Sequence, residues 1–214
     1  MTDRLIIEGL MSTVGPGNVV HVTAMGAHVD RADDRVMELR PFFPSTTWDN
    51  LYGTRRGVFH MTDDMLQFAR IVMRSEQPRV NWVTVEGKLF PLVEGACRWW
   101  ALEATSFSDE GARGRIAARV VSYREERPFI GLHRARHAVL EAAILATRTH
   151  ILSAGEIRRQ LANVAPWVDK TGGRSERIAF AELSEYIERR LGGPSNPPDA
   201  CLDSRQSGAS NAGM

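Results

Sequence analysis

The sequence lacks several features that would assign it at once to a broad class of protein. No window approaches the roughly 18 uninterrupted apolar residues of a membrane-spanning helix, and the N-terminal MTDRLIIEGLMST has no signal-peptide core. The net charge is only +1, so neither nucleic acid nor an anionic membrane is an expected partner. Its two cysteines, Cys97 and Cys201, are far apart and form no CxxC motif or disulfide framework, which favours a reducing, cytoplasmic location.

A glycine-rich Walker or Rossmann motif is also missing. The rest is ordinary for a globular protein, with 214 residues, a hydrophobic fraction of 43% and a charged fraction of 25%. A chain of this length can bury a full core without disulfides or metals, as one large domain or a domain with an appendage.

The first 125 residues read mostly as β-strands. Branched residues in 4–14, the turn-forming VGPGN and the alternating 18–29 predict a hairpin. Other elements predicted in this part are strands at 35–40 and 56–61, a short helix at 46–52, a helix at 62–74 with Thr62 as its cap, and two long strands within 94–125. Six strands with helical interruptions predict a small, mainly antiparallel barrel.

The last third of the chain changes to helical patterns. Helices are predicted at 132–152, at 153–164 behind the capping box of Ser153 and Glu156, and at 175–193. The polar, Gly/Ser/Pro-rich residues 194–214 predict a disordered tail. The expected fold is α+β, with a barrel domain at 1–130, a helical segment at 131–193 packed on it, and the tail.

The segment LRPFFPSTTWDNLYGTRRG, residues 39–57, groups an arginine, three hydroxyls and an amide: Arg40, Ser45, Thr46, Thr47 and Asn50. Arg40 offers a planar set of donors that matches phosphate, and a helix starting near Thr46 would turn its free N–H groups toward an anion. A phosphate monoester at a strand-to-helix turn would use all of these groups. Helix capping, with Arg40 paired to a surface carboxylate, explains the same residues without a ligand.

Two further candidates lie in predicted strands. Ala24, Met25 and Gly26 combine small residues with a mid-strand glycine, which would let a flat ligand approach the backbone or would instead mark a bulge or tight bend. His60 ends the strand at 56–61, where it either packs as a buried polar residue or contacts a ligand at the barrel edge.

His133, His137 and Glu141 fall on one face of a predicted helix. A zinc site could use them, but the neighbouring Arg134 and Arg136 are cationic and no other ligand cluster lies nearby in sequence. A polar helix face with Glu141 paired to an arginine accounts for the pattern better, and no metal is predicted. Small residues along this helix suit close packing in a core or at a homodimer seam.

The motifs VTAMG, LRPFFPSTTWDNLYGTRRGVFHMTDD and RHAVLEAAILATRTHIL, in this order, resemble the family of domain of unknown function 447. That family is similar to the FMN-binding split barrels, which include flavin reductases. The resemblance covers roughly residues 5 to 165, and the split-barrel order of a hydroxyl cluster, an asparagine and a G-x-F strand is matched by Ser45 to Thr47, Asn50 and Gly57 to Phe59.

The resemblance implies a six-stranded split barrel that forms a homodimer, with FMN near the dimer interface. By position, the FMN phosphate would be held by Arg40, Ser45, Thr46, Thr47 and Asn50. The isoalloxazine ring would lie along the backbone of Ala24, Met25 and Gly26, and His60 would reach the ribityl chain or the phosphate. The helical C-terminal third departs from simple flavin reductases, so it leaves the substrate undefined.

Three functions are consistent with these residues. The first is an FMN-dependent oxidoreductase of flavin-reductase type, with a small-molecule redox substrate that the sequence does not define and the chemistry carried by the flavin. The second is a flavin-binding carrier or sensor without catalysis. The third is a metal-dependent hydrolase that uses His133, His137 and Glu141.

Overall fold

Six strands form a closed antiparallel barrel in the computed structural model, which describes residues 4–30 and 33–192. Around the barrel the strand order is β1-β2-β3-β8-β7-β4, and β4 closes the ring by pairing with β1. The bounds are β1 Arg4–Val14, β2 Val20–Asp30, β3 Asp33–Leu39, β4 Arg56–Met61, β7 Arg98–Asp109 and β8 Gly114–Glu125. The predicted α+β fold and six-stranded barrel are confirmed, whereas the predicted disorder of 194–214 lies outside the described residues.

The first hairpin follows from its turn chemistry. Gly15–Asn18 forms the bend, where Gly17 (φ 68°) and Asn18 (φ 61°) take the left-handed conformation that these residue types favour. The turn sets β1 against β2 from Arg4↔Asp30 to Val14↔Val20 without interruption. Both strands are 11 residues long, so they extend well past the barrel wall formed with β4.

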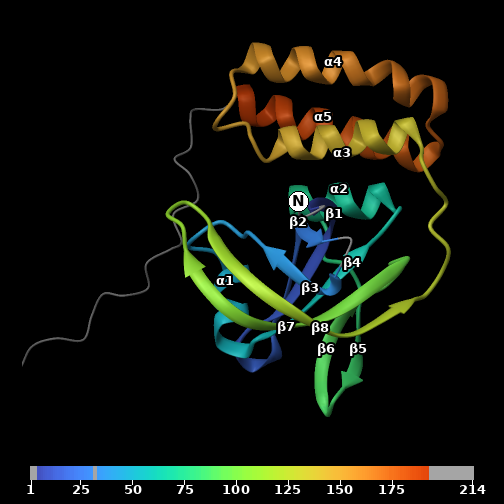
Figure 1. Ribbon diagram of the computed structural model, residues 1–214. Helices are drawn as coiled ribbons and strands as arrows, with labels where there is room; N and C mark the ends of the chain where they lie inside the picture. Colours follow the sequence, from blue (N-terminus) through green and yellow to red (C-terminus); the bar gives the residue numbers. More distant parts are fainter. Residues whose placement is uncertain (1–3, 31–32, 193–214) are drawn as a thin grey trace, which may run out of the picture.

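A second, two-stranded sheet was not predicted. β5 Val80–Val85 and β6 Lys88–Val93 form a hairpin that lies at the end of the barrel opposite the helices (Figure 1). Its tight turn is Glu86–Gly87, with φ of 49° and 74°, the conformation of a type I′ turn. Phe90 of β6 packs in a buried cluster with Val58 and Trp99 of the barrel.

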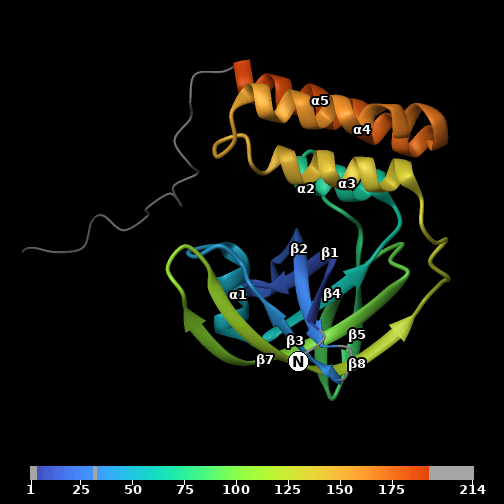
Figure 2. The ribbon, with the colours of Figure 1, turned by 45° about the horizontal axis from the view of Figure 1, so that its top comes forward.

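The helices form a layer over the other end of the barrel (Figures 1 and 2). α2 Met65–Met73 lies directly against the barrel, and α3 Arg134–Ala146, α4 Ala154–Thr171 and α5 Arg174–Gly192 lie beyond it. α2 is capped by Asp64, whose side chain accepts from the N–H of Gln67 at 3.0 Å, and not by Thr62 as predicted. Thr62 instead accepts from the N–H of Asp64 at 3.0 Å, one step before the helix.

α4 also differs from its prediction. It begins after Ser153 as the capping box requires, but it continues to Thr171 instead of stopping at 164. Pro166 lies inside it, where the missing N–H costs one helical hydrogen bond. Val164 and Val168, on either side of the proline, are buried against Ala135 and Ala138 of α3. In the described part of the chain, no helix is both long and apolar enough to cross a membrane.

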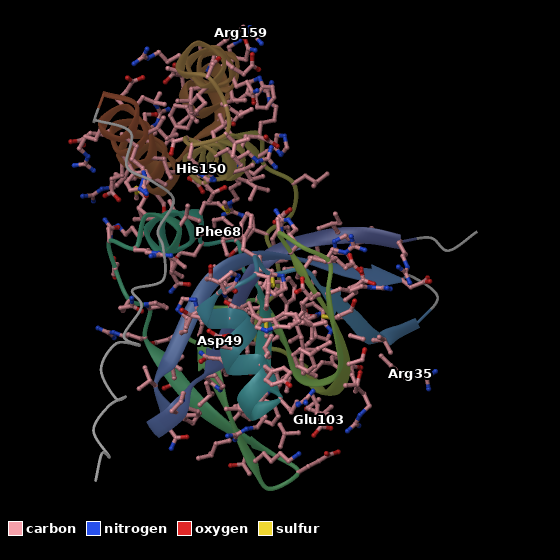
Figure 3. The ribbon with its side chains drawn as sticks, turned by 90° about the vertical axis from the view of Figure 1, so that its left-hand side faces the viewer. Arg35, Asp49, Phe68, Glu103, His150 and Arg159 are labelled. Atoms are coloured by element: carbon pink, nitrogen blue, oxygen red, sulfur yellow. The ribbon has the colours of Figure 1, made fainter. Side chains whose placement is uncertain are left out.

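One hydrophobic cluster joins the barrel to the helices. It includes Leu10 of β1, Phe68 of α2, Val139 of α3 and Leu183 of α5, and Figure 3 places Phe68 between the barrel and the outer helices. A separate cluster fills the barrel, where Met11, Met37, Leu39 and Phe59 pack under Trp48 of the short helix α1 Thr46–Thr54. The barrel is therefore closed by side chains on the inside, and ligands can reach it only from its outer wall or edges.

Candidate anion-binding site on the barrel wall

The segment between β3 and α1 is fixed to the turn of the β7–β8 hairpin, and the two lie side by side in Figure 1. The N–H of Gly114 donates to the carbonyl of Pro41 at 2.9 Å, and the N–H of Phe43 donates to the carbonyl of Ala112 at 3.2 Å. Arg113 donates from Nη1 to the carbonyl of Arg40 at 3.0 Å. These bonds bring the tip of a distant hairpin to the predicted phosphate segment.

Arg40 lies on the outer face of the wall with Glu38, because residues two apart in an extended chain point to the same side. Arg40 Nε donates to Glu38 Oε1 at 2.7 Å, and Arg115 Nε donates to Glu38 Oε2 at 2.8 Å. Arg4 reaches the same carboxylate at 3.6 Å. Burial would raise the pKa of Glu38, but hydrogen bonds from Arg40 and Arg115 outweigh it and hold that pKa below its ordinary value.

The charges around this carboxylate are unbalanced. The groups joined here by ion pairs and hydrogen bonds form a cluster of net charge +2, made of Arg4, Arg40, Arg113 and Arg115 with Glu38 and Glu110. Glu8 lies outside this cluster, beside Gly26 on the same outer face. A phosphate monoester carries about −1.5 to −2 at neutral pH. The cluster therefore has the charge that such an anion would neutralise.

The N-terminus of α1 lies five residues beyond Arg40. Ser45 is the N-cap, and its hydroxyl accepts from the N–H of Trp48 at 3.3 Å, so the capping interpretation of this residue is correct in the structure described. Thr46 is exposed at the first helical position. Its hydroxyl and the free N–H groups of the first turn remain suited to an anion.

Thr47 and Asn50 point away from this surface. Thr47 is 3% exposed and Asn50 is 7% exposed. Asn50 Nδ2 donates to Thr13 Oγ1 at 3.0 Å, which ties α1 to β1. In this chain conformation both residues hold the helix in place and do not present donors beside Arg40.

The three residues of the predicted ring-binding segment, Ala24, Met25 and Gly26, lie in three different surroundings. Ala24 packs against the cluster under the helices, and Met25 points into the barrel. Gly26 lies on the outer face, where an added Cβ would sit 2.7 Å from Ile6 and 3.3 Å from the carboxylate of Glu8. Of the three residues, Gly26 shares the face that carries Arg40, and the side chains of Ile6 and Glu8 lie against it.

His28 is next to Gly26 on this outer face and is paired with Glu38 across the sheet. Burial lowers its pKa, and the positive charge of Arg40 lowers it further, so His28 is neutral at pH 7. A neutral imidazole can donate through one nitrogen and accept through the other. His28 thus adds a hydrogen-bonding group beside Glu38 on this face.

His60 lies in the interior, fully buried. Its Nδ1 is 3.2 Å from the carbonyl of Leu10, and its Nε2 accepts from the N–H of Val93 at 3.0 Å. Both ring nitrogens contact backbone groups, so in this conformation His60 presents neither of them to a ligand.

His133, His137 and Glu141 do not form a metal-binding group. No cluster of three or more His, Cys, Asp or Glu side chains suited to a metal occurs within residues 4–30 and 33–192. His133 is the N-cap of α3, and His137 stacks on Trp167 while its Nε2 lies 3.7 Å from Glu141 Oε1. These residues act as a polar helix face.

Sequence reasoning missed Glu38, His28, Arg113 and Arg115. Alternation along β2 and β3 could have identified the first two, because His28 follows Gly26 and Glu38 precedes Arg40 at the two-residue period of one strand face. Arg113 and Arg115 carry no local signal, since only the pairing of β8 with β3 brings them near Arg40.

Comparison with solved structures shows the same fold in an FMN-bound protein of Methanosarcina mazei. It is 20% identical, with a TM-score of 0.72 over 85% of this chain and 94% of that chain. The styrene monooxygenase flavin reductase of Pseudomonas putida S12 is 16% identical, with a TM-score of 0.48 over 56% of this chain and 80% of its own. A flavoredoxin of Methanosarcina acetivorans is 10% identical, with a TM-score of 0.48 over 58% and 75% of the two chains.

Among curated proteins, nothing matches the sequence. Two family models do match it. The N-terminal domain of the proteins of unknown function DUF447 matches residues 7–127, and a second DUF447 model matches residues 133–185. The chain therefore belongs to the DUF447 family, as its sequence motifs predict.

Proposed function

We propose that this protein binds FMN and works as an oxidoreductase of flavin-reductase type. The observation that carries the proposal is the cluster of net charge +2 around Glu38, in and beside the segment that leads from β3 into α1. An FMN-bound protein of the same fold and family supports the choice of ligand. The donors present fit a phosphate monoester, because they combine guanidinium groups, a hydroxyl and helical N–H groups.

Four residues would hold the phosphate: Arg40, Arg113, Ser45 and Thr46. The two arginines supply charge, and Thr46 with the first turn of α1 supplies directional donors. A flat ring could approach the backbone at Gly26 once the side chains of Ile6 and Glu8 move aside, and His28 offers a neutral hydrogen-bonding group on the same face. Bound FMN would supply the redox chemistry itself, by accepting and donating hydride.

We further propose a homodimer, a small-molecule redox substrate and a cytoplasmic location. The sparse cysteines support the location, and the single described cysteine, Cys97, is buried and unpaired. Hydride transfer through a flavin needs no protein acid or base, which suits a site built from positioning groups.

A flavin titration of the apoprotein tests the proposal. FMN should bind more tightly than riboflavin, which has the same ring and no phosphate. Arg40→Ala should weaken FMN binding by more than about tenfold, because a charge-assisted hydrogen bond is lost, and should leave riboflavin binding unchanged. Fluorescence quenching of the flavin measures both affinities.

Arg158→Ala is the matched control, since Arg158 also pairs with a glutamate, Glu188, but between α4 and α5. It should alter neither affinity. Equal binding of FMN and riboflavin by the wild-type protein would contradict the phosphate site. Oxidation of NADH or NADPH by the holoprotein separates the oxidoreductase from a flavin carrier without catalysis.

A further inference from the structure

We infer that Glu38 is the positioning residue of the anion site, which orients Arg40 toward the phosphate and so sets the preference for FMN over riboflavin. The inference rests on the proposed function and assigns the site a residue that makes no contact with the anion itself.

Glu38 holds the guanidinium group of Arg40 at one nitrogen and leaves the other two exposed. Glu38 engages Arg40 through Nε alone, at 2.7 Å. Among the described residues, the two terminal Nη nitrogens of Arg40 make no hydrogen bond, and its side chain is 40% exposed. A guanidinium held at Nε has a fixed plane and presents its remaining donors outward, which is the fork that matches phosphate.

Glu38 is largely buried and is surrounded by arginines. Its side chain is only 11% exposed, and it accepts from Arg115 as well as Arg40 while Arg4 lies 3.6 Å away. These arginines come from β1, β8 and the end of β3, so one carboxylate gathers cations from three parts of the barrel. Without it the arginines would repel one another and spread into solvent.

A glutamate beside an anion site could instead oppose the anion. Here the negative charge of Glu38 is already neutralised, because three guanidinium groups surround its carboxylate. Repulsion between Glu38 and a phosphate is therefore small compared with the ordering of Arg40. The structure thus predicts that removing the carboxylate charge weakens phosphate binding and does not strengthen it.

Glu103 provides a matched control on the same barrel. It too is paired with two cations, Lys88 and Arg119, each at 2.7 Å, and it has no contact with Arg40. Figure 3 shows it on the part of the barrel far from the helices. Glu38→Gln and Glu103→Gln therefore each remove one negative charge that is paired with two cations. Only Glu38→Gln removes the carboxylate that holds Arg40.

The experiment measures the dissociation constants of FMN and riboflavin for the wild-type protein and both variants. Glu38→Gln should weaken FMN binding about tenfold and leave riboflavin binding within about twofold, so the preference for FMN collapses. Glu103→Gln should leave both constants unchanged. Glu38→Asp, which keeps the charge but is one methylene shorter, should lose only part of the preference.

Other outcomes overturn the inference. Tighter FMN binding by Glu38→Gln would make Glu38 a competitor of the phosphate. Equal weakening of both flavins, or an unchanged preference, would reduce it to a structural ion pair. If Glu38→Gln does not fold, an undiminished preference in Glu38→Asp overturns the inference in the same way.

Failure of the proposed function is distinguishable from these results. If the wild-type protein does not prefer FMN to riboflavin, the proposed phosphate site is contradicted, and the inference about Glu38 is contradicted with it. A different result contradicts only the inference about Glu38. In that result the wild type prefers FMN, Arg40→Ala loses the preference, and Glu38→Gln keeps it.

Discussion

At the scale of single residues, burial holds His60 neutral although its ring is hydrogen-bonded to the backbone. Its ring lies between a carbonyl acceptor at Leu10 and an N–H donor at Val93, an arrangement that suits the tautomer with its proton on Nδ1. Burial lowers the pKa of His60 to about 4. Hydrogen bonds to the carbonyls of Leu10 and Val58 raise this pKa, but burial outweighs them. A protonated ring could also no longer accept from the N–H of Val93.

His60 should therefore make stability fall with decreasing pH. Below about pH 6.5 the unfolded chain takes up a proton that folded His60 does not accept until about pH 4, so the loss occurs between these values. The contribution is on the order of 3 kcal/mol in the free energy of unfolding. Chemical denaturation of the wild type and His60→Gln across this range measures it.

The variant should be less stable at pH 7 but should lose less stability between pH 6.5 and 4. His150→Gln changes an exposed histidine in the helical layer (Figure 3) and should keep the wild-type pH dependence. Parallel pH profiles for the wild type and His60→Gln would contradict the assignment.

Residue types in the segment 40–50 indicated an anion site, but their directions could not be read from the sequence. Thr46 and Thr47 are neighbours, yet Thr46 is exposed and Thr47 is buried, because a helix turns about 100° per residue. Asn50 faces Thr13 for the same reason. Local sequence can thus predict a polar cluster near Arg40, and only the packing of α1 on β1 decides which members face solvent.

At the scale of elements, strong local signals predicted strands and helices, and weak turn signals were missed. VGPGN marked the first hairpin, and Ser153 with Glu156 marked the start of α4. The β5–β6 hairpin turns on Glu86–Gly87, a pair with less turn preference than Asn-Gly, and Pro91 lies within its second strand, where proline is unfavourable. Its formation depends on burial of Phe90 against the barrel, which is a tertiary effect.

The cap of α4 gives a test at this scale. Ser153 Oγ accepts from the N–H of Glu156 at 3.2 Å, and Ser153→Ala leaves that N–H without its protein acceptor. The free energy of unfolding should fall by about 1 kcal/mol. Thermal or urea denaturation detects a change of this size.

Ser184→Ala is the control within the neighbouring helix. Ser184 lies inside α5, where its hydroxyl donates to the carbonyl of Phe180, a group that already belongs to the helical ladder. Its removal should change stability by less than about 0.5 kcal/mol. If Ser153→Ala and Ser184→Ala lowered the free energy of unfolding equally, the N-cap hydrogen bond of Ser153 would have no special contribution to stability.

At the scale of the whole molecule, one buried carboxylate ties the barrel to the helices. Asp63, 5% exposed between β4 and α2, pairs with Arg127 and lies 3.4 Å from Arg136 of α3. It also accepts from the N–H of Ile130 at 3.2 Å. The hydrogen bond from Arg127 dominates its environment and lowers the pKa of Asp63 to about 2, so the carboxylate stays charged at neutral pH.

Asp63→Asn should lower the free energy of unfolding by about 3 kcal/mol, because two arginines lose the charge that balances them in a largely buried setting. In the wild type this contribution is present above about pH 4 and is lost as the pH falls toward 2. Denaturation at pH 7 compares the variant with Asp169→Asn, which alters an exposed residue 4.0 Å from Arg177. A loss no larger than that of the control would contradict the role of Asp63.

The shared core under α2 has a consequence for how this chain can change over generations. Leu10, Val22 and Ala24 of the barrel are covered by the same apolar cluster that contains Val139 and Leu183 of the outer helices. A gene that kept the barrel and lost the helices would expose this surface at once. We therefore expect the two segments to be inherited together, and a relative with the barrel alone to carry polar residues at these three strand positions.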